Sequence, residues 1–205
     1  MIDLHIHSNY SDGKGSIAEI ARIAKRKNLK KIAIVDHNSF NERKAKRRQE
    51  EIDDASSAFG VKIYSGIECD IEEDGKIYLP DFDFDIVIAS IHSNLDGLKY
   101  YERIIKCVET YEVHVVAHVF SPIFGFESRI EELDRKLVDA MKNAEVAVEI
   151  NSLHKCPDVD FLMMCDEAGL YYSIGSDAHE ISRVGEVSWS LKKAKRYMKR
   201  SRLLV

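Results

Sequence analysis

The chain has 205 residues, a hydrophobic content of 45%, a charged content of 32% and a formal net charge of −5 at pH 7. This length supports one sizeable core, so we expect a single domain over residues 1–205. The composition excludes a disordered or fibrous protein, and no apolar stretch approaches the roughly 20 residues of a membrane span. The N-terminal segment has no signal-peptide pattern. We therefore expect a cytoplasmic globular protein with no membrane partner.

Strand-like and helix-like segments alternate along the chain. Apolar runs predict strands at residues 2–6, 32–35, 61–67, 86–91, 113–119, 146–150 and 170–174, and Asp74-Gly75 signals a hairpin within 71–79. A helix is predicted to begin at Ser16, which forms a capping box with Glu19. Further helices are predicted at 41–59, 98–110, 130–143 and 158–169, and a basic C-terminal helix at about 189–202.

The cysteines and the basic residues carry weaker signals. The four cysteines form no CxxC pair, which favours reduced intracellular thiols; they are Cys69, Cys107, Cys156 and Cys165.

Residues 192–202 hold seven basic side chains and no acidic one, and a second basic run at 43–48 is followed at once by acids. We interpret both runs as solvated helix faces, with contact to a phosphate backbone as the alternative.

Seven βα units of similar size predict a parallel sheet with crossover helices. An open doubly wound sheet and a closed barrel both fit this alternation. All seven strands, however, are followed by polar residues at their C-terminal ends. A barrel brings every strand end to one mouth, whereas an open sheet uses only its switch point. We therefore favour an α/β barrel of seven strands.

Six of the eight histidines follow apolar runs, most with a carboxylate close by. His5 and His7 must project to the same side, because a strand alternates its faces. Imidazoles and carboxylates that converge from several strand ends are typical of a multinuclear transition-metal site. The candidate residues are His5, His7, Asp36, His37, Glu68, His92, His118, Asp177 and His179.

The remaining histidines fit the pattern less well. His114 opens a strand at the end away from the mouth, so we interpret it as structural, and we interpret His154 as a loop residue. Asp36 has two equal interpretations. It orients the imidazole of His37 from behind, or it accepts a backbone hydrogen bond at the strand end.

Several motifs resemble those of the PHP (polymerase and histidinol phosphatase) family, in the same order, from residue 3 to about residue 187. The opening motif is Asp3-Leu4-His5-Ile6-His7-Ser8-Asn9-Tyr10-Ser11-Asp12-Gly13, and the closing one is Gly175-Ser176-Asp177-Ala178-His179. Between them lie Ile34-Val35-Asp36-His37-Asn38, Gly66-Ile67-Glu68, Ser90-Ile91-His92 and Ala117-His118.

This resemblance implies a distorted, TIM-like (β/α)7 barrel with three divalent metal ions at its mouth. His5, His7, Glu68 and Asp177 would hold one ion, and Glu68 would bridge to a second ion held by His92 and His118. Asp12, His37 and His179 would hold the third. Some relatives have histidine where Asp12 stands, and either residue is a competent ligand. Zinc, manganese and iron all suit these ligands.

The expected chemistry is hydrolysis of a phosphate ester. Close-set ions generate a hydroxide at neutral pH and neutralise charge on the phosphate, so Glu68, Asp177 and His179 are the predicted catalytic residues. Phosphate contacts are predicted from loops at the mouth, by Arg183 first and also by Lys14, Arg129, Lys155 and Asn151. For each cation a solvated surface position is the competing interpretation.

We expect a phosphomonoesterase acting on a small phosphorylated metabolite or nucleotide. A nuclease or phosphodiesterase acting on DNA or RNA is the first alternative, kept open by the basic C-terminal run. A non-catalytic RNA- or protein-binding barrel is the second, and the complete ligand set counts against it. The substrate itself and the oligomeric state are not determined by these residues.

Overall fold

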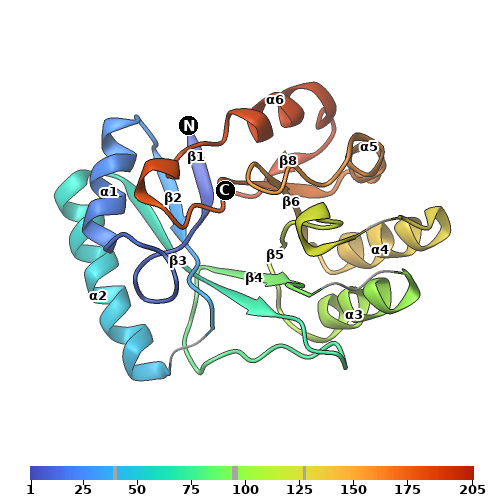
Figure 1. Cartoon of the computed structure of the whole chain (residues 1–205), viewed down its shortest axis with the longest axis horizontal. Coiled ribbons are helices and arrows are strands. Elements are labelled where there is room, and N and C mark those ends of the chain that lie inside the picture. The colour runs from blue at the N-terminus through green and yellow to red at the C-terminus, as the bar shows by residue number, and fades with distance from the viewer. Residues whose placement is uncertain (39–40, 94–96, 127) are drawn as a thin grey trace.

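The computed structural model describes residues 1–38, 41–93, 97–126 and 128–205. These residues form eight parallel strands, each paired with the next in the order β1 to β8 (Figure 1). The strands are β1 (Ile2–Ile6), β2 (Lys31–Ile34), β3 (Lys62–Asp70), β4 (Ile86–Ser90), β5 (Val115–Val116), β6 (Ala147–Asn151), β7 (Tyr171–Gly175) and β8 (Arg202–Leu203).

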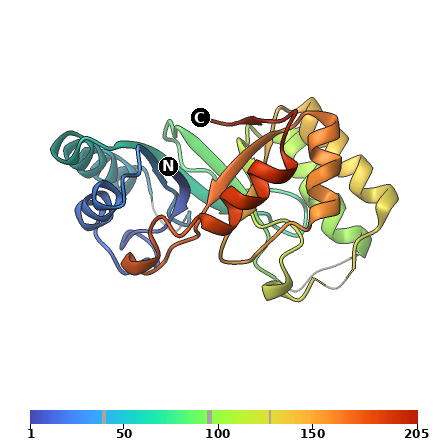
Figure 2. The same cartoon turned by 90° about the horizontal axis from the view of Figure 1, so that it is seen from above.

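Helices cover the outside of this curled sheet. They are α1 (Ile17–Arg26), α2 (Glu42–Phe59), α3 (Gly97–Thr110), α4 (Glu131–Asn143), α5 (Val159–Ala168) and α6 (Ser188–Tyr197), with short 3₁₀ helices η1 (Pro122–Phe124) and η2 (Ile181–Arg183). Figure 2 shows α1 and α2 at one end of the sheet, α3 to α5 at the other, and α6, in red, over the middle. No described helix combines the length and the apolar character that crossing a membrane requires.

The sheet curls into a partly closed barrel. The end of β1 meets the residues that follow β7: His7 N donates to Ala178 O at 3.0 Å and Asp177 N donates to His5 O at 2.9 Å. Below this contact, Asp3 accepts hydrogen bonds from Ser176 and from the Gly185 amide. Inside the barrel lie small and branched side chains: Leu4, Ala33, Val35, Ile86, Ile88, Val115, Ala117 and Ala147. The fold is therefore the expected distorted TIM-like barrel.

Three predicted elements differ from the structure. The 71–79 segment forms no strand; a turn is present, with Glu72 N bonded to Lys76 O and Gly75 N to Glu72 O, but its flanks do not pair as a hairpin. The C-terminal helix ends at Tyr197 rather than near 202, and Arg202 and Leu203 add β8 to β7. The predicted strand 113–119 shortens to two residues; His118 and Phe120, with φ 31° and 60°, have left-handed rather than extended backbone.

The basic run at 43–48 is only partly a solvated face. Arg48 is fully buried, and its Nε donates to Asp36 Oδ2 at 2.7 Å. Other guanidinium nitrogens bond to the Ser65 hydroxyl and to the carbonyls of Ile34 and Gly66. Interpreting Arg48 as solvated was wrong, because this side chain has a buried carboxylate and three other acceptors under the helix.

All four cysteines are free and buried. Burial raises the pKa of the Cys107 thiol to about 12, and it raises the pKa of Cys69, Cys156 and Cys165 as well. A thiol reacts as its thiolate. We therefore expect no reaction with Ellman's reagent at pH 8 in the native protein, and four thiols titrated after unfolding in guanidinium. Rapid native labelling would contradict the burial.

Candidate metal centre

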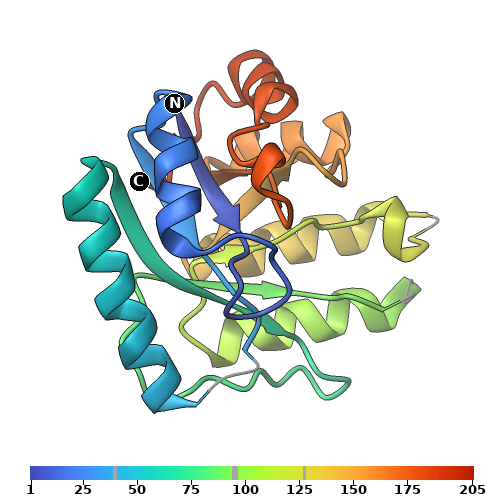
Figure 3. The same ribbon diagram turned by 60° about the vertical axis from the view of Figure 1, so that its left-hand side comes forward.

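All nine predicted ligands come together at the C-terminal ends of the strands. β1 and the loop after it supply His5, His7 and Asp12, and Figure 3 shows this loop, in dark blue, curling at the tip of the β1 arrow. The other strands supply the rest from their last residues or from the residues that follow: His37, Glu68, His92, His118, Asp177 and His179. Strand ends therefore build the cluster, as the sequence predicts.

Glu68 occupies the centre of the cluster, and its side chain is almost fully buried. Its two carboxylate oxygens face different histidines. Oε2 lies 3.4–3.5 Å from nitrogens of His5, His7 and His37. Oε1 lies 3.2 Å from His118 Nε2 and 3.5 Å from His92 Nε2. This arrangement suits a carboxylate that bridges two ions.

Asp177 and Asp12 complete the anionic part of the cluster. Asp177 Oδ1 lies 3.5–3.6 Å from nitrogens of His5, His7 and His179. Asp12 is half exposed, and its Oδ2 lies 3.1 Å from His179 Nε2 and 3.7 Å from His37 Nε2. Asp12 therefore groups with two of the partly exposed histidines of the cluster, at the solvent side of the site.

The backbone is strained where two of these side chains leave it. His118 has φ 31° and Asp177 has φ 54°, and both values fall in the left-handed region. Such conformations cost on the order of 1–3 kcal/mol each in a non-glycine residue and persist where the surrounding structure fixes them. Here they turn the chain at the ends of β5 and β7, so that both side chains face the cluster.

Two further carboxylates support the histidines from behind. Glu149 is fully buried on β6, and its Oε1 lies 2.7 Å from His5 Nδ1. Asp70 is hydrogen-bonded to His92 Nδ1. Gly175 makes room for the first pair, since a Cβ there would lie 2.1 Å from Glu149 Oε1. Asp70 was missed in the sequence, although it shares a strand face with Glu68 two residues before it.

The electrostatics follow from this crowding. Burial opposes the charge on Glu68 and Asp177, but neighbouring histidines, His5 above all, hold the pKa of both carboxyls well below their ordinary values. Burial likewise disfavours the His5 imidazolium, yet Glu149, Asp177 and Glu68 raise its pKa well above the usual range. The carboxylates of the cluster thus stay ionised and favour positive charge beside them.

The donor set fits transition-metal ions. Ligand atoms at 2.0–2.2 Å from one tetrahedral ion lie roughly 3.3–3.6 Å apart, the range of most distances given above. These separations are too long for good hydrogen bonds. His5 Nε2 and His7 Nε2 approach to 3.1 Å, and the buried His7 Nδ1 has no hydrogen-bond partner. Imidazole nitrogens and carboxylate oxygens at these separations are what a bound cation would bring together.

Among the described residues, four overlapping sets of side chains could each hold an ion. They are His7, Asp12, His37 and His179; His5, His7 and Asp177; His37, Glu68 and His92; and His118, His154 and Asp177. Three of the sets consist of predicted ligands. The fourth contains His154, whose place in the cluster the sequence did not indicate.

Asp36 and His114 have structural roles. Asp36 is fully buried and accepts bonds from the Ser8 amide at 2.7 Å, from the Ser8 and Ser11 hydroxyls and from Arg48, but none from the His37 imidazole. The backbone interpretation was therefore the better one. His114 Nδ1 accepts from Val87 N at 3.0 Å on the sheet, as expected for a structural residue.

The side chains predicted to contact substrate are dispersed. Arg183 lies along the flank of α1: Lys27 Nζ binds the carbonyls of Ser182 and Val184, and no contact among the described residues joins Arg183 to the cluster. Arg129 pairs with Asp134 and Asp158. Asn151 does reach the cluster, where its Nδ2 lies 3.0 Å from Glu149 Oε2 and 3.1 Å from Asp177 Oδ2. Lys155 is exposed beside His154.

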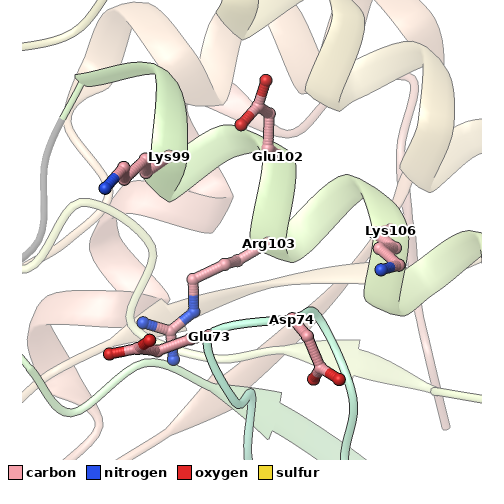
Figure 4. A pocket seen from close by; sticks show the side chains of 6 residues that line it. All are labelled: Glu73, Asp74, Lys99, Glu102, Arg103 and Lys106. Carbon is pink, nitrogen blue, oxygen red and sulfur yellow. The ribbon is translucent and has the colours of Figure 1, made fainter.

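A separate cavity of about 480 Å³ lies between α3 and the 72–76 turn, away from the histidines. Figure 4 shows Lys99, Glu102, Arg103 and Lys106 on the helix and Glu73 and Asp74 across from it. Its lining of three cations and three anions contains no metal-ligand cluster. The candidate site is therefore the strand-end cluster rather than this cavity.

Comparison with known proteins agrees with this geometry. The family described as PHP domain matches residues 3–153. This chain belongs to the PHP domain family. It is 29% identical to the DNA polymerase/3'-5' exonuclease PolX of Bacillus subtilis (strain 168), over 95% of this chain and 37% of that protein. It is also 29% identical to the probable histidinol-phosphatase of Thermotoga maritima, over 94% of this chain and 92% of that protein.

Two solved structures share the fold. The histidinol phosphate phosphatase of Lactococcus lactis, crystallised with zinc, L-histidinol and phosphate, aligns with a TM-score of 0.75 and 20% identity over 97% of this chain and 92% of that one. The putative histidinol phosphatase of Listeria monocytogenes aligns with a TM-score of 0.71 and 16% identity, over 93% of this chain and 99% of that one. The PHP barrel of this chain therefore spans nearly the whole of both structures.

Proposed function

We propose that this PHP protein is a metal-dependent phosphomonoesterase with three divalent ions at the barrel mouth. One observation carries the proposal. The two carboxylate oxygens of Glu68 face different sets of histidines, as a carboxylate that bridges two ions would. Family membership and the phosphatases among the relatives support the coarser class, a hydrolase of phosphoric esters. The ions would lie with His5, His7, Glu68 and Asp177; with Glu68, His92 and His118; and with Asp12, His37 and His179.

Bound ions would supply Lewis acidity toward the phosphate oxygens and a nucleophile from water at neutral pH. The protein's contribution is to hold the ligands and to leave an accessible side. Asp12 and His179 are the ligand side chains most open to solvent, with exposures of 53% and 34%. Substrate would enter there. The exposed Lys14, two residues after Asp12, and Lys155, one residue after His154, would be the cations that meet its phosphate.

A small substrate fits better than a nucleic acid. Arg202 pairs with Tyr171 at the start of β7, the end of the strand opposite Asp177. The C-terminal basic residues that follow α6 therefore lie at the far end of the barrel from the cluster. At that distance they do not form, together with the metal centre, one surface that could bind a phosphate backbone. Because PolX and the histidinol phosphatases share this domain, histidinol phosphate and an oligonucleotide belong together in the substrate panel.

The test is metal removal followed by a substrate panel. Protein loaded with zinc, manganese or iron(II) should hydrolyse p-nitrophenyl phosphate or histidinol phosphate, and EDTA followed by dialysis should abolish the turnover until metal is restored. Bis-(p-nitrophenyl) phosphate and a single-stranded oligonucleotide serve as controls. Preferential cleavage of either control would overturn the monoester assignment.

The same samples give a stability measurement. An ion present at 100 times its dissociation constant stabilises the folded state by about 2.7 kcal/mol. We therefore expect the chelated protein to melt several degrees lower than the loaded protein. Equal melting temperatures would mean that no ion binds the folded state preferentially.

A further inference from the structure

His154 lies inside the cluster although it is not one of the nine predicted ligands. It belongs to the turn after β6, and only 6% of its surface is exposed. Its Nε2 lies 3.1 Å from Asp177 Oδ2, and its Nδ1 lies 2.5 Å from Ser121 Oγ. One imidazole therefore links the segment after β5 to the predicted ligand after β7.

The chemistry of the carboxylate fixes the direction of the hydrogen bond between His154 and Asp177. An ionised carboxylate only accepts, so the bond to Asp177 requires the hydrogen on His154 Nε2. The other ring nitrogen, Nδ1, is hydrogen-bonded to the Ser121 hydroxyl. Ser121 is itself held, because its Oγ accepts from Ile123 N at 3.2 Å at the start of η1.

The two carboxylate oxygens of Asp177 have different partners. Oδ2 receives His154 Nε2 and also Asn151 Nδ2, at 3.1 Å each. Oδ1 receives no such donor and faces the histidine cluster at 3.5–3.6 Å. The two donors thus hold the carboxylate in one rotation, with one oxygen left free for a cation.

The ring of His154 is poorly oriented to be a ligand beside His118. The two rings stack with centroids 4.6 Å apart and an interplanar angle of 21°. Imidazole lone pairs lie in the ring plane, so lone pairs of nearly parallel stacked rings do not converge on one point. Phe124 packs against both rings, at 5.4 Å from His118 and 5.1 Å from His154, and helps to keep them stacked.

We propose that His154 is a positioning residue that orients the Asp177 carboxylate for metal binding through a Ser121–His154–Asp177 relay. The proposal rests on the metal centre of the proposed function. It assigns His154 a hydrogen-bonding role and not a place in the coordination sphere. Partners of this kind set the orientation of the ligands, and losing one typically lowers metal affinity by about 10- to 100-fold.

Two substitutions separate the hydrogen bond from the stacking. His154→Phe keeps an aromatic ring on His118 but has no donor, whereas His154→Gln loses the ring and keeps an N–H near the position of Nε2. We expect zinc affinity, measured on metal-free protein by competition with a chromophoric chelator, to fall about 10- to 100-fold in His154→Phe. It should stay close to that of the unsubstituted protein in His154→Gln, and both variants should still bind the full number of ions at saturation.

Other results would overturn the proposal. If both variants lose one whole ion by elemental analysis, His154 is a ligand; if His154→Phe binds zinc normally, the relay has no role. Ser121→Ala, which leaves His154 in place, should weaken zinc binding in the same direction and provides the test if His154→Phe does not fold. Because the readout needs no substrate, intact zinc binding without phosphatase activity would count against the proposed function alone.

Discussion

Glu68→Gln is expected to reduce phosphatase activity by more than about 100-fold, beyond the usual range for losing a residue that only supports a ligand. Both Glu68 oxygens face imidazoles, on opposite sides of the carboxylate. The glutamine side chain has one neutral oxygen, which accepts, and one NH2 group, which donates. It therefore cannot bridge two cations between the two histidine sets. Initial rates with saturating metal, together with elemental analysis for bound ions, measure the effect.

The matched control is Glu72→Gln, the same chemical change on an exposed side chain four residues along the chain. Its activity and metal content should match those of the unsubstituted protein. Thermal melting of the metal-free variants shows whether Glu68→Gln still folds. A folded Glu68→Gln variant with normal turnover would contradict the bridging role and the proposed mechanism with it.

Arg48→Met is expected to lower the free energy of unfolding by about 3–5 kcal/mol, the usual cost of removing one partner of a buried ion pair. Arg48 and Asp36 are both fully buried, and their side chains are 2.7 Å apart. Without the guanidinium, Asp36 keeps its bonds from Ser8 and Ser11 but loses its counter-charge. Most domains have only about 5–15 kcal/mol of stability, so this loss is large. Urea unfolding measures it.

The adjacent arginine provides the control. Arg47 is 76% exposed and pairs with Glu51 at 3.4 Å on the same helix. Exposed pairs contribute at most about 1 kcal/mol, so Arg47→Met should be nearly neutral. The Asp36→Ala/Arg48→Met double variant should cost less than the sum of the two single variants, since each removes the same interaction. Additive costs would mean that the ion pair contributes little.

Local patterns in the sequence determined most of the fold and the candidate ligands. The capping box of Ser16 and Glu19, and the helix bounded by Asp158 and Gly169, are present as predicted. These features depend on neighbours within one turn of helix, so the chain needs no distant contact to specify them. The cluster was predictable for a related reason. Parallel strands in a barrel place their C-terminal ends at one mouth, so position along each strand decides which side chains meet.

Long-range contacts decided the rest. The 71–79 segment carries a turn signal, but pairing depends on a partner strand, and none forms. Residues 202–203 continue a basic run, yet they become β8 because the edge of β7 offers free backbone groups. Neither outcome is encoded within the segment itself.

The same holds for single side chains. In sequence Arg48 resembles its solvated neighbours, and only the buried Asp36 beneath α2 distinguishes it. In sequence His154 resembles an ordinary loop histidine. Only its contacts with Ser121 and Asp177 show that its side chain faces the cluster. The sequence by itself determined which strand ends carry the candidate metal ligands. The tertiary structure decided which charged or polar side chains from helices and loops join them, because a buried polar group goes where distant partners satisfy it.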